Sequence, residues 1–347
     1  MNAKKVQMPR EVYTGPDVTK EVGDICNSLH LEGEALIVAG PHTFDVCGEQ
    51  IIDSLTEKGF KSDVIKIKGA SMESVKSVED MIPDKGFVFG VGGGRVIDIA
   101  KLASTNKGVY FLSVPTTASH DGMASPMASI KVDDGSVSMK AQSPYAVIAD
   151  SKIIMDSPFE LMSAGCADLI SNYTAIKDWQ LAHRLKNERY SESAVALSEI
   201  SAKFITDNAE SIKPGLEKSA RLVIKTLFCS GLAISIAGSS RPASGSEHLF
   251  SHALDKILDK PKLHGAQCGI GTILMMALYG DDWKFIRDSL KAVQAPVNAK
   301  ELGVSEDVII EALTTAHSIR PNRYTILGEN GISEEAAYDL AHETEVI

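Results

Sequence analysis

Three histidines and one aspartate in the second half of the chain have the types and spacing of metal ligands. His248 and His252 are four residues apart in SGSEHLFSHALD, so a helix would place both on one face. His264 follows in KLHGAQCGIG, and Asp168 lies upstream in GCADLISNYTAIKDW. One carboxylate and imidazoles from separate helices can form a site for a divalent metal that keeps an open position.

The alternative is that these histidines cap helices or fill the core, which is the favoured interpretation of an isolated H-x-x-x-H pattern. Two features count against it here. The pair follows a Gly/Ser-rich stretch, 244–246, and His264 comes 12 residues after His252, directly before another glycine. The remaining histidines do not belong to a comparable cluster in the sequence and are expected to be structural or exposed. They are His30, His42, His183, His317 and His342.

A run of three glycines in the first half predicts a phosphate-binding loop. The segment FVFGVGGGRVIDIAK, 87–101, passes from a buried strand through the glycines into a helix. Glycines let backbone N–H groups approach a pyrophosphate, and a helix N-terminus favours negative charge. The common G-x-G-x-x-G fingerprint is not met, because Arg95 stands at its last position, so a merely tight turn is the alternative. Asp98, one turn into the helix, could cap it or contact a ligand.

A polar loop follows the next expected strand. It reads PTTASHDGMASP, 115–126, and offers hydroxyl, imidazole and carboxylate groups. Open α/β sheets bind their ligands at the carboxyl ends of strands, which is where this loop begins. An ordinary capped loop is the alternative, and the loop alone does not decide between the two.

The elements that must carry these motifs change in kind along the chain. Up to residue 150, buried apolar runs alternate with helical spacing, which predicts a parallel, Rossmann-like sheet with right-handed crossovers. A hairpin is expected around Asp133-Asp134-Gly135-Ser136. The apolar runs expected to form strands are 35–39, 63–68, 87–91 and 109–114.

Beyond residue 150, long helical patterns take over and strand-like runs nearly vanish. The sequence therefore predicts an α/β domain over residues 1–157 and an all-α domain over 158–347. The acidic tail is expected to be a surface helix or a fraying end. The expected helices are 164–185, 191–212, 218–237, 246–258, 265–279 and 305–316.

Composition narrows the classes of function. The chain has 46 acidic and 35 basic residues, a net charge of −11, so it lacks the basic stripe of a nucleic-acid-binding protein. An anionic small ligand remains compatible, because a pocket can be locally positive. Five scattered cysteines without a C-x-x-C pair indicate neither a disulfide framework nor a thiolate zinc site. The N-terminus lacks the apolar core of a signal peptide, and the longest weakly polar run, 268–280, is 13 residues, too short to span a bilayer. A cytoplasmic protein is expected.

Five segments together resemble the glycerol-1-phosphate dehydrogenases, in the superfamily of iron-containing alcohol dehydrogenase, glycerol dehydrogenase and dehydroquinate synthase. The segments are GGGRVIDIAK, PTTASHDG, GCADLISNYTAIKDW, SEHLFSHALD and HGAQCGIGT, and they follow in the order of the family over almost the whole chain. The SHDG loop and the ADLISNYTA segment are most similar to the archaeal form. The resemblance implies a dehydroquinate synthase-like fold, with an α/β domain followed by a helical one.

The resemblance also implies a role for each matching residue. A catalytic zinc ion, one per subunit, is held by Asp168, His248 and His264. Asp121, Asp168 and His252 contact the substrate, and Asp121 and His252 are the catalytic residues. The implied contacts with NAD(H) or NADP(H) are Gly92, Gly93, Gly94, Arg95, Val96, Ile97, Asp98, Thr116, Thr117, Ala118, Ser119 and Ser125.

The implied reaction is the reversible reduction of dihydroxyacetone phosphate to sn-glycerol 1-phosphate, which supplies the glycerol backbone of archaeal phospholipids. A metal in such a site polarises the ketone oxygen, and His252, directly or through water, is a candidate proton relay. The expected partner is a phosphorylated triose, with no nucleic acid and no membrane span, and the chain is expected to form a homo-oligomer. Arg320 and Arg323 in SIRPNRYTIL could bind the substrate phosphate, although exposed arginines are the commoner case.

Three other functions compete with this interpretation. A glycerol dehydrogenase or another alcohol dehydrogenase of the superfamily would share fold, metal and cofactor but act on a non-phosphorylated polyol. A dehydroquinate synthase-like lyase is less favoured, because no lysine-rich loop follows the glycines. A non-enzymatic nucleotide-binding regulator would be favoured by the loss of a metal ligand, and Asp168, His248 and His264 are all present.

The strand ends predict acceptance of both nicotinamide cofactors. Enzymes strict for NAD often place an acidic residue where the adenosine ribose binds, and neither 39–42 nor 67–69 contains one. We therefore expect NADPH to be accepted as well as NADH. Comparing kcat/KM for the two cofactors tests this, and a preference for NADH of about a thousandfold, roughly 4 kcal/mol, would contradict it.

Overall fold

The computed structural model describes residues 5–132 and 135–347, which form two compact units. The first unit contains the chain up to Phe159 together with Pro214–Gly231, and the second contains Glu160–Lys213 and Leu232–Ile347. The division predicted at 157/158 lies beside the first of these boundaries. The segment Pro214–Gly231 differs from the expectation, because it groups with the first unit rather than with the helical part.

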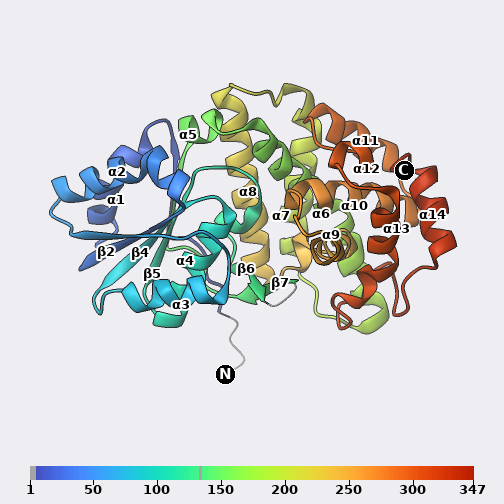
Figure 1. The fold of residues 1–347 in the computed structure, drawn as a ribbon, viewed down its shortest axis with the longest axis horizontal. Coiled ribbons are helices and arrows are strands. Elements are labelled where there is room, and N and C mark those ends of the chain that lie inside the picture. Colours follow the sequence, from blue (N-terminus) through green and yellow to red (C-terminus); the bar gives the residue numbers. More distant parts are fainter. Residues whose placement is uncertain (1–4, 133–134) are drawn as a thin grey trace. The chain divides into compact units, whose positions relative to one another are not determined.

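A six-stranded parallel sheet forms the centre of the first unit (Figure 1). Its strand order is β1-β8-β5-β4-β2-β3. The sequence predicted four of the strands and missed β1 and β8; the α/β fold with a Rossmann-like parallel sheet is confirmed. The bounds are β1 Glu11–Gly15, β2 Glu34–Ala39, β3 Ser62–Lys66, β4 Gly86–Gly92, β5 Tyr110–Pro115 and β8 Ala146–Asp150.

Helices cover both faces of this sheet, which explains why its central strands are apolar without alternation. On β4, Phe87 and Phe89 point into the core beneath α1 and α2, whereas Gly90 faces Ile97 and Ala100 of α4. Figure 1 shows α2 and α4 on opposite sides of the sheet. The helices of this unit are α1 Val22–Ser28, α2 Pro41–Glu57, α3 Met72–Met81, α4 Gly94–Lys107 and α5 Ser151–Asp156, with short 3-10 turns η1 Val18–Glu21 and η2 Asp121–Met123.

The strand order places the glycine run at a topological switch point. From β2 the chain continues through α2 to β3 on one side, and from β4 it continues through α4 to β5 on the other. Ligands of open α/β sheets bind where neighbouring connections diverge in this way. Thr43 ties the two loops together, because its hydroxyl donates to the Val91 carbonyl oxygen at 2.9 Å and accepts from the Gly40 amide at 2.9 Å.

A buried lysine connects α4 to the loop and hairpin that follow β5. Lys101 is fully buried, and its ammonium group contacts Asp98 Oδ1 at 3.1 Å and the Gly122 carbonyl oxygen at 2.7 Å. The other Asp98 oxygen accepts from the Ser129 amide at 2.9 Å. Ser129 lies in β6 (Met127–Val132), which pairs antiparallel with β7 (Gly135–Lys140) as the predicted hairpin. The expected turn residues Asp133 and Asp134 lie outside the described residues.

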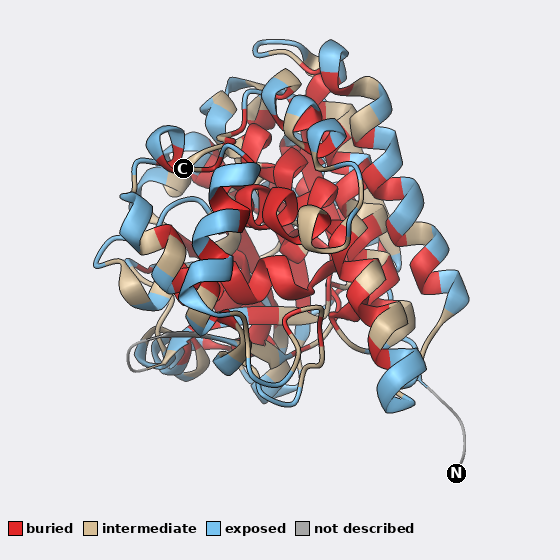
Figure 2. Ribbon diagram, turned by 90° about the vertical axis from the view of Figure 1, so that its right-hand side faces the viewer, coloured by how far each residue is buried: buried red, intermediate tan, exposed pale blue. Residues whose placement is uncertain are grey.

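The second unit is built from helices, and Figure 2 shows its central helices buried and its peripheral ones with exposed faces. Helix α10, which contains the longest apolar run noted in the sequence, is almost wholly buried, so it belongs to the core. The acidic tail forms a helix, α14. The bounds are α6 Phe159–Lys186, α7 Glu192–Asn208, α9 Ser246–Ile257, α10 His264–Leu278, α11 Trp283–Ala292, α12 Ala299–Leu302, α13 Glu306–Thr315 and α14 Glu334–Glu343, with 3-10 turns η3 Ala209–Ser211, η4 Arg241–Ala243 and η5 Ala316–Ser318.

Helix α8, Glu217–Ala237, begins in the first unit and ends in the second. Its first part groups with the sheet because Ser151 donates to Glu217 at 2.6 Å and Ser230 donates to Asp121 at 2.9 Å. Within the described part of the chain, α8 alone is long and apolar enough to cross a membrane, with a mean hydropathy of 1.6. Just over half of that window, 56%, is buried inside the protein.

Replacing Lys101 by methionine should destabilise the first unit. The change leaves the buried Asp98 carboxylate without its cation, and breaking a buried ion pair costs about 3–5 kcal/mol. We expect the free energy of unfolding, measured by urea denaturation with circular dichroism, to fall by about that amount. Lys107→Met, on the exposed end of the same helix, is the control. Equal effects of the two substitutions would contradict the structural role of Lys101.

Candidate functional site

Four side chains of the second unit converge on one point. They are Asp168 of α6, His248 of α9, and His264 and Cys268 of α10, and their ligand atoms all lie within 4.8 Å of one another. The Nε2 atoms of His248 and His264 both lie 3.7 Å from Asp168 Oδ1. Two donors on one tetrahedral zinc ion are about 3.4 Å apart. The three atoms therefore have nearly the spacing that one metal ion requires.

Glycine allows the helices that carry these residues to cross closely. A Cβ atom on Gly265 would lie 1.8 Å from the carbonyl oxygen of Ala164, one turn before Asp168. Only glycine fits there, and its position brings His264 against α6. A Cβ atom on Gly271 would similarly lie 2.9 Å from the carbonyl oxygen of Glu247, beside His248. The glycines of the HGAQCGIG segment thus set the distances between the ligand-bearing helices.

A buried glutamate orients His248. Glu247 Oε1 lies 2.8 Å from His248 Nδ1 and accepts from the Gly245 amide at 2.6 Å. Its other oxygen accepts from the Thr174 hydroxyl at 2.6 Å. The carboxylate can only accept, so Nδ1 carries the proton and Nε2 keeps its lone pair for a metal. The sequence analysis missed Glu247; the available signal was an acid beside a predicted ligand.

Neutral polar groups orient His264 in the same way. Ser251 Oγ lies 3.1 Å from His264 Nδ1, and Gln267 donates to Ser251 Oγ at 2.9 Å. Gln267 also donates to Asp255 Oδ1 at 3.0 Å, which links α9 and α10. Both imidazoles are therefore held through Nδ1 and directed through Nε2 toward Asp168.

The electrostatic surroundings keep the imidazole ligand neutral. Burial, together with electrostatic repulsion from His252, Arg320 and Arg323, holds the pKa of His248 well below its ordinary value. A neutral imidazole is the form that binds metals. Burial and the nearby Asp168 carboxylate raise the pKa of the Cys268 thiol well above its usual value. The thiol therefore favours its protonated form, which is a poor ligand compared with a thiolate.

A second buried carboxylate fixes the start of α9. Asp178 accepts from the Ser246 amide at 2.6 Å, from the Tyr279 hydroxyl at 2.8 Å and from the Ile326 amide at 2.7 Å. Burial and the neighbouring Glu247 raise the pKa of Asp178 to about 6. These bonds join α6, α9 and α10 with the segment after η5.

His252 lies one turn beyond His248 on α9. Its ring centre is 6.5 Å from that of His248 and 5.9 Å from that of His264. Its Nε2 lies 3.4 Å from Arg320 Nη2, and its Nδ1 lies 3.6 Å from Asp255 Oδ2. Because a guanidinium only donates, the contact with Arg320 favours a lone pair on Nε2 and a proton on Nδ1.

The predicted nucleotide loops lie together in the first unit. Gly93 precedes the first turn of α4, where the amides of Gly94 and Arg95 lack partners within the helix. The Thr117 hydroxyl lies 3.4 Å from the position of a Cβ atom on Gly93, and the Thr116 amide donates to the Gly92 carbonyl at 3.1 Å. The two loops therefore face one another around a helix N-terminus suited to a phosphate.

Some of the residues predicted to contact the cofactor are buried in the first unit. Val96, Ile97 and Ala118 are buried apolar side chains, and the Asp98 carboxylate is bonded to Lys101 and Ser129. Asp98 therefore neither caps α4 nor offers a free oxygen, and its contact with a cofactor stays a prediction.

Asp121 is half-buried in η2, apart in sequence from the metal cluster. It accepts from Ser230 at 2.9 Å, and burial raises the pKa of its carboxyl. His120 Nδ1 accepts from the Gly122 amide at 2.9 Å, and a Cβ atom on Gly94 would lie 1.7 Å from His120 Nε2. Ser119 precedes this imidazole, and Ser125 is buried near Gly231 of α8. Among the predicted substrate contacts, Asp121 belongs to the first unit, and Asp168 and His252 belong to the second.

The chain is similar to known proteins over its full length. Residues 13–158 match the family model of iron-containing alcohol dehydrogenases. Over the full length of both chains, the protein is 68% identical to a glycerol-1-phosphate dehydrogenase [NAD(P)+] of Methanobrevibacter smithii. It is 58% identical, again over both full lengths, to the protein of that name from Methanothermobacter thermautotrophicus.

The fold is shared more widely. The crystal structure of glycerol dehydrogenase from Schizosaccharomyces pombe superposes with a TM-score of 0.83 at 17% identity, covering 99% of this chain and 91% of that one. At this identity the likeness shows the fold alone.

Substituting Glu247 by glutamine should weaken metal binding. The amide can still contact His248 but no longer supplies the negative charge that fixes its tautomer, and loss of such a partner costs about 10–100-fold in affinity. Titrating zinc into chelator-treated protein by calorimetry measures this. His342→Ala, at an exposed histidine of α14, serves as the control. Unchanged affinity in the Glu247 variant would show that this carboxylate does not support the site.

Proposed function

The chain belongs to the glycerol-1-phosphate dehydrogenase family, and we propose that it reduces dihydroxyacetone phosphate to sn-glycerol 1-phosphate, reversibly, with NADH or NADPH. The observation that carries this proposal is the convergence of two oriented imidazole Nε2 atoms on Asp168, in a chain 68% identical to a relative of that name. The product would supply the glycerophosphate backbone of archaeal phospholipids. We propose a cytoplasmic enzyme, and the homo-oligomer stays a prediction.

The donor set fits a divalent cation. Asp168, His248 and His264 supply one oxygen and two nitrogen atoms at 3.7 Å spacings from the shared carboxylate oxygen, and zinc accepts such ligands. When bound, the ion would polarise the ketone oxygen and stabilise the developing negative charge as hydride arrives. Cys268 is the fourth member of the cluster, and a site held by the other three residues alone would leave a coordination position for the substrate oxygen.

His252 is suited to move a proton at the substrate oxygen. Its ring lies beside those of both histidine ligands, and its Nδ1 has no hydrogen-bond partner among the described residues. The Asp255 carboxylate, 3.6 Å from Nδ1, can stabilise positive charge on the ring during proton transfer. His252, directly or through water, can therefore protonate the alkoxide in reduction and accept the proton in oxidation.

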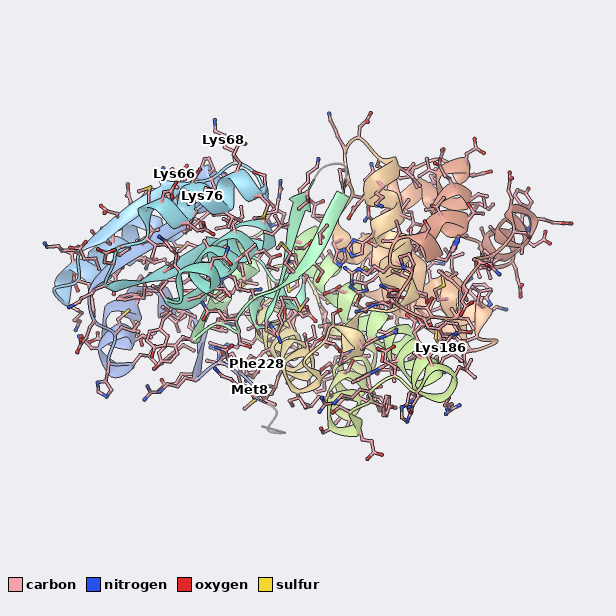
Figure 3. The ribbon with its side chains drawn as sticks, turned by 90° about the horizontal axis from the view of Figure 1, so that it is seen from below. Met8, Lys66, Lys68, Lys76, Lys186 and Phe228 are labelled. Atoms are coloured by element: carbon pink, nitrogen blue, oxygen red, sulfur yellow. The ribbon has the colours of Figure 1, made fainter. Side chains whose placement is uncertain are left out.

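The first unit is suited to hold the nicotinamide cofactor, which would supply the hydride. The exposed amides at the start of α4 can bind the pyrophosphate, and the Thr116–Thr117 loop lies beside them. At the neighbouring strand ends, Ala39 pairs with Lys66, and Figure 3 shows Lys66 and Lys68 close together. Both lysines are exposed, and such positive charge supports acceptance of the 2′-phosphate of NADPH.

Assays with two ketones test the proposed function. We expect NAD(P)H oxidation with dihydroxyacetone phosphate to be much faster than with dihydroxyacetone, and the product to be sn-glycerol 1-phosphate by chiral analysis. Asp168→Asn should lower kcat/KM at least about a hundredfold, because a metal ligand contributes several kcal/mol to the transition state. Asp207→Asn, at an exposed aspartate of α7, is the control.

The same experiment identifies the competing functions. A preference for dihydroxyacetone would indicate a polyol dehydrogenase, and the mirror-image product would overturn the stereochemical assignment. Full activity after chelation and removal of the chelator, together with normal turnover by Asp168→Asn and His264→Ala, would refute the metal site.

A further inference from the structure

Three arginines of the second unit differ in what their guanidinium groups already bind. Arg241 forms two hydrogen bonds with Glu188 and donates to the Tyr324 carbonyl at 2.9 Å. Arg323 donates to the Ser244 carbonyl and to Ser240 Oγ, the latter at 2.8 Å. Both groups therefore brace η4 and the segment that leads into α9.

Arg320 is different. Its one hydrogen-bond contact among the described residues is Nη2 with His252 Nε2 at 3.4 Å, and no described carboxylate forms an ion pair with it. The side chain is half-buried, so its charge is partly removed from water without a compensating anion. A guanidinium carries five N–H donors, most of which Arg320 leaves available to a ligand.

Arg320 also lies within reach of the metal cluster. It contacts His252, whose ring centre is 5.9 Å from that of His264, and α9 packs against η5, from which the Arg320 segment continues. In a triose phosphate the carbonyl oxygen and the phosphorus atom are on the order of 5 Å apart. With the ketone oxygen at the point where Asp168, His248 and His264 converge, the phosphate can extend past His252 toward the guanidinium.

Building on the proposed function, we propose that Arg320 binds the phosphate group of the substrate and selects phosphorylated over non-phosphorylated trioses. A planar guanidinium binds phosphate through two parallel hydrogen bonds, which gives direction as well as charge. In a chain of net charge −11, this cation makes the site locally attractive to a dianion. Arg323 acts as a positioning residue that holds the Arg320 segment to the start of α9.

The test compares discrimination between the two ketones. For Arg320→Gln, we expect the ratio of kcat/KM for dihydroxyacetone phosphate to that for dihydroxyacetone to fall roughly 10- to 150-fold, the range for charged hydrogen bonds. Arg320→Lys keeps the charge but not the two parallel bonds and should fall between Arg320→Gln and the unaltered protein. Arg184→Gln, at an exposed arginine of α6, should leave the ratio and the basal activity unchanged. Circular dichroism and thermal unfolding confirm that each variant is folded.

Inorganic phosphate provides a probe that does not depend on turnover. Its affinity, measured as stabilisation against thermal unfolding, should fall at least about tenfold in Arg320→Gln. An equal loss of activity toward both ketones, with phosphate affinity retained, would overturn the proposal. It would show instead that Arg320 acts through its contact with His252. If the unaltered protein fails to reduce dihydroxyacetone phosphate, the proposed function fails, and the phosphate measurement still decides whether Arg320 is an anion-binding residue.

Discussion

The approach of two imidazoles to one aspartate oxygen is the constraint on which the second unit depends. The close crossing of α6, α9 and α10 brings the Nε2 atoms of His248 and His264 to 3.7 Å from Asp168 Oδ1. That crossing requires a residue without a side chain at Gly265, because a Cβ atom there would overlap the Ala164 carbonyl. The apolar surface of α10 then supplies the packing that holds the helices together.

Burying such a cluster would be costly without partners for its polar atoms. Glu247 accepts from Thr174 and the Gly245 amide while holding His248, and Ser251 and Gln267 hold His264. Burial raises the pKa values of both Asp178 and Glu247, and the charge of Glu247 raises that of Asp178 further. Buried carboxylates of this kind are offset by hydrogen bonds and by the nearby arginines, so the region is locally balanced although the chain as a whole is acidic.

The sequence could predict the α/β and helical halves because their hydrophobic periods differ. It also singled out Asp168, His248 and His264, since the glycines and the H-x-x-x-H spacing drew attention to them. The sequence analysis missed Glu247 because its partner Thr174 is distant in sequence. It missed Ser251 because Ser251 and His264 become neighbours only when α9 and α10 pack. Strands β1 and β8 were missed, and they pair with each other, and β8 with β5, only in the finished sheet. The assignment of Pro214–Gly231 to the first unit follows from contacts of Glu217 and Ser230 that no local pattern reveals.

The central claim is that one carboxylate and two imidazoles, without the neighbouring thiol, hold the ion. X-ray absorption at the zinc edge of the zinc-loaded protein tests this directly. We expect nitrogen and oxygen neighbours at about 2.0–2.2 Å from the zinc ion. We also expect scattering from more distant ring atoms that is typical of two imidazole ligands. A sulfur neighbour at about 2.3 Å would show that Cys268 is a ligand, and protein that retains no zinc would contradict the site altogether.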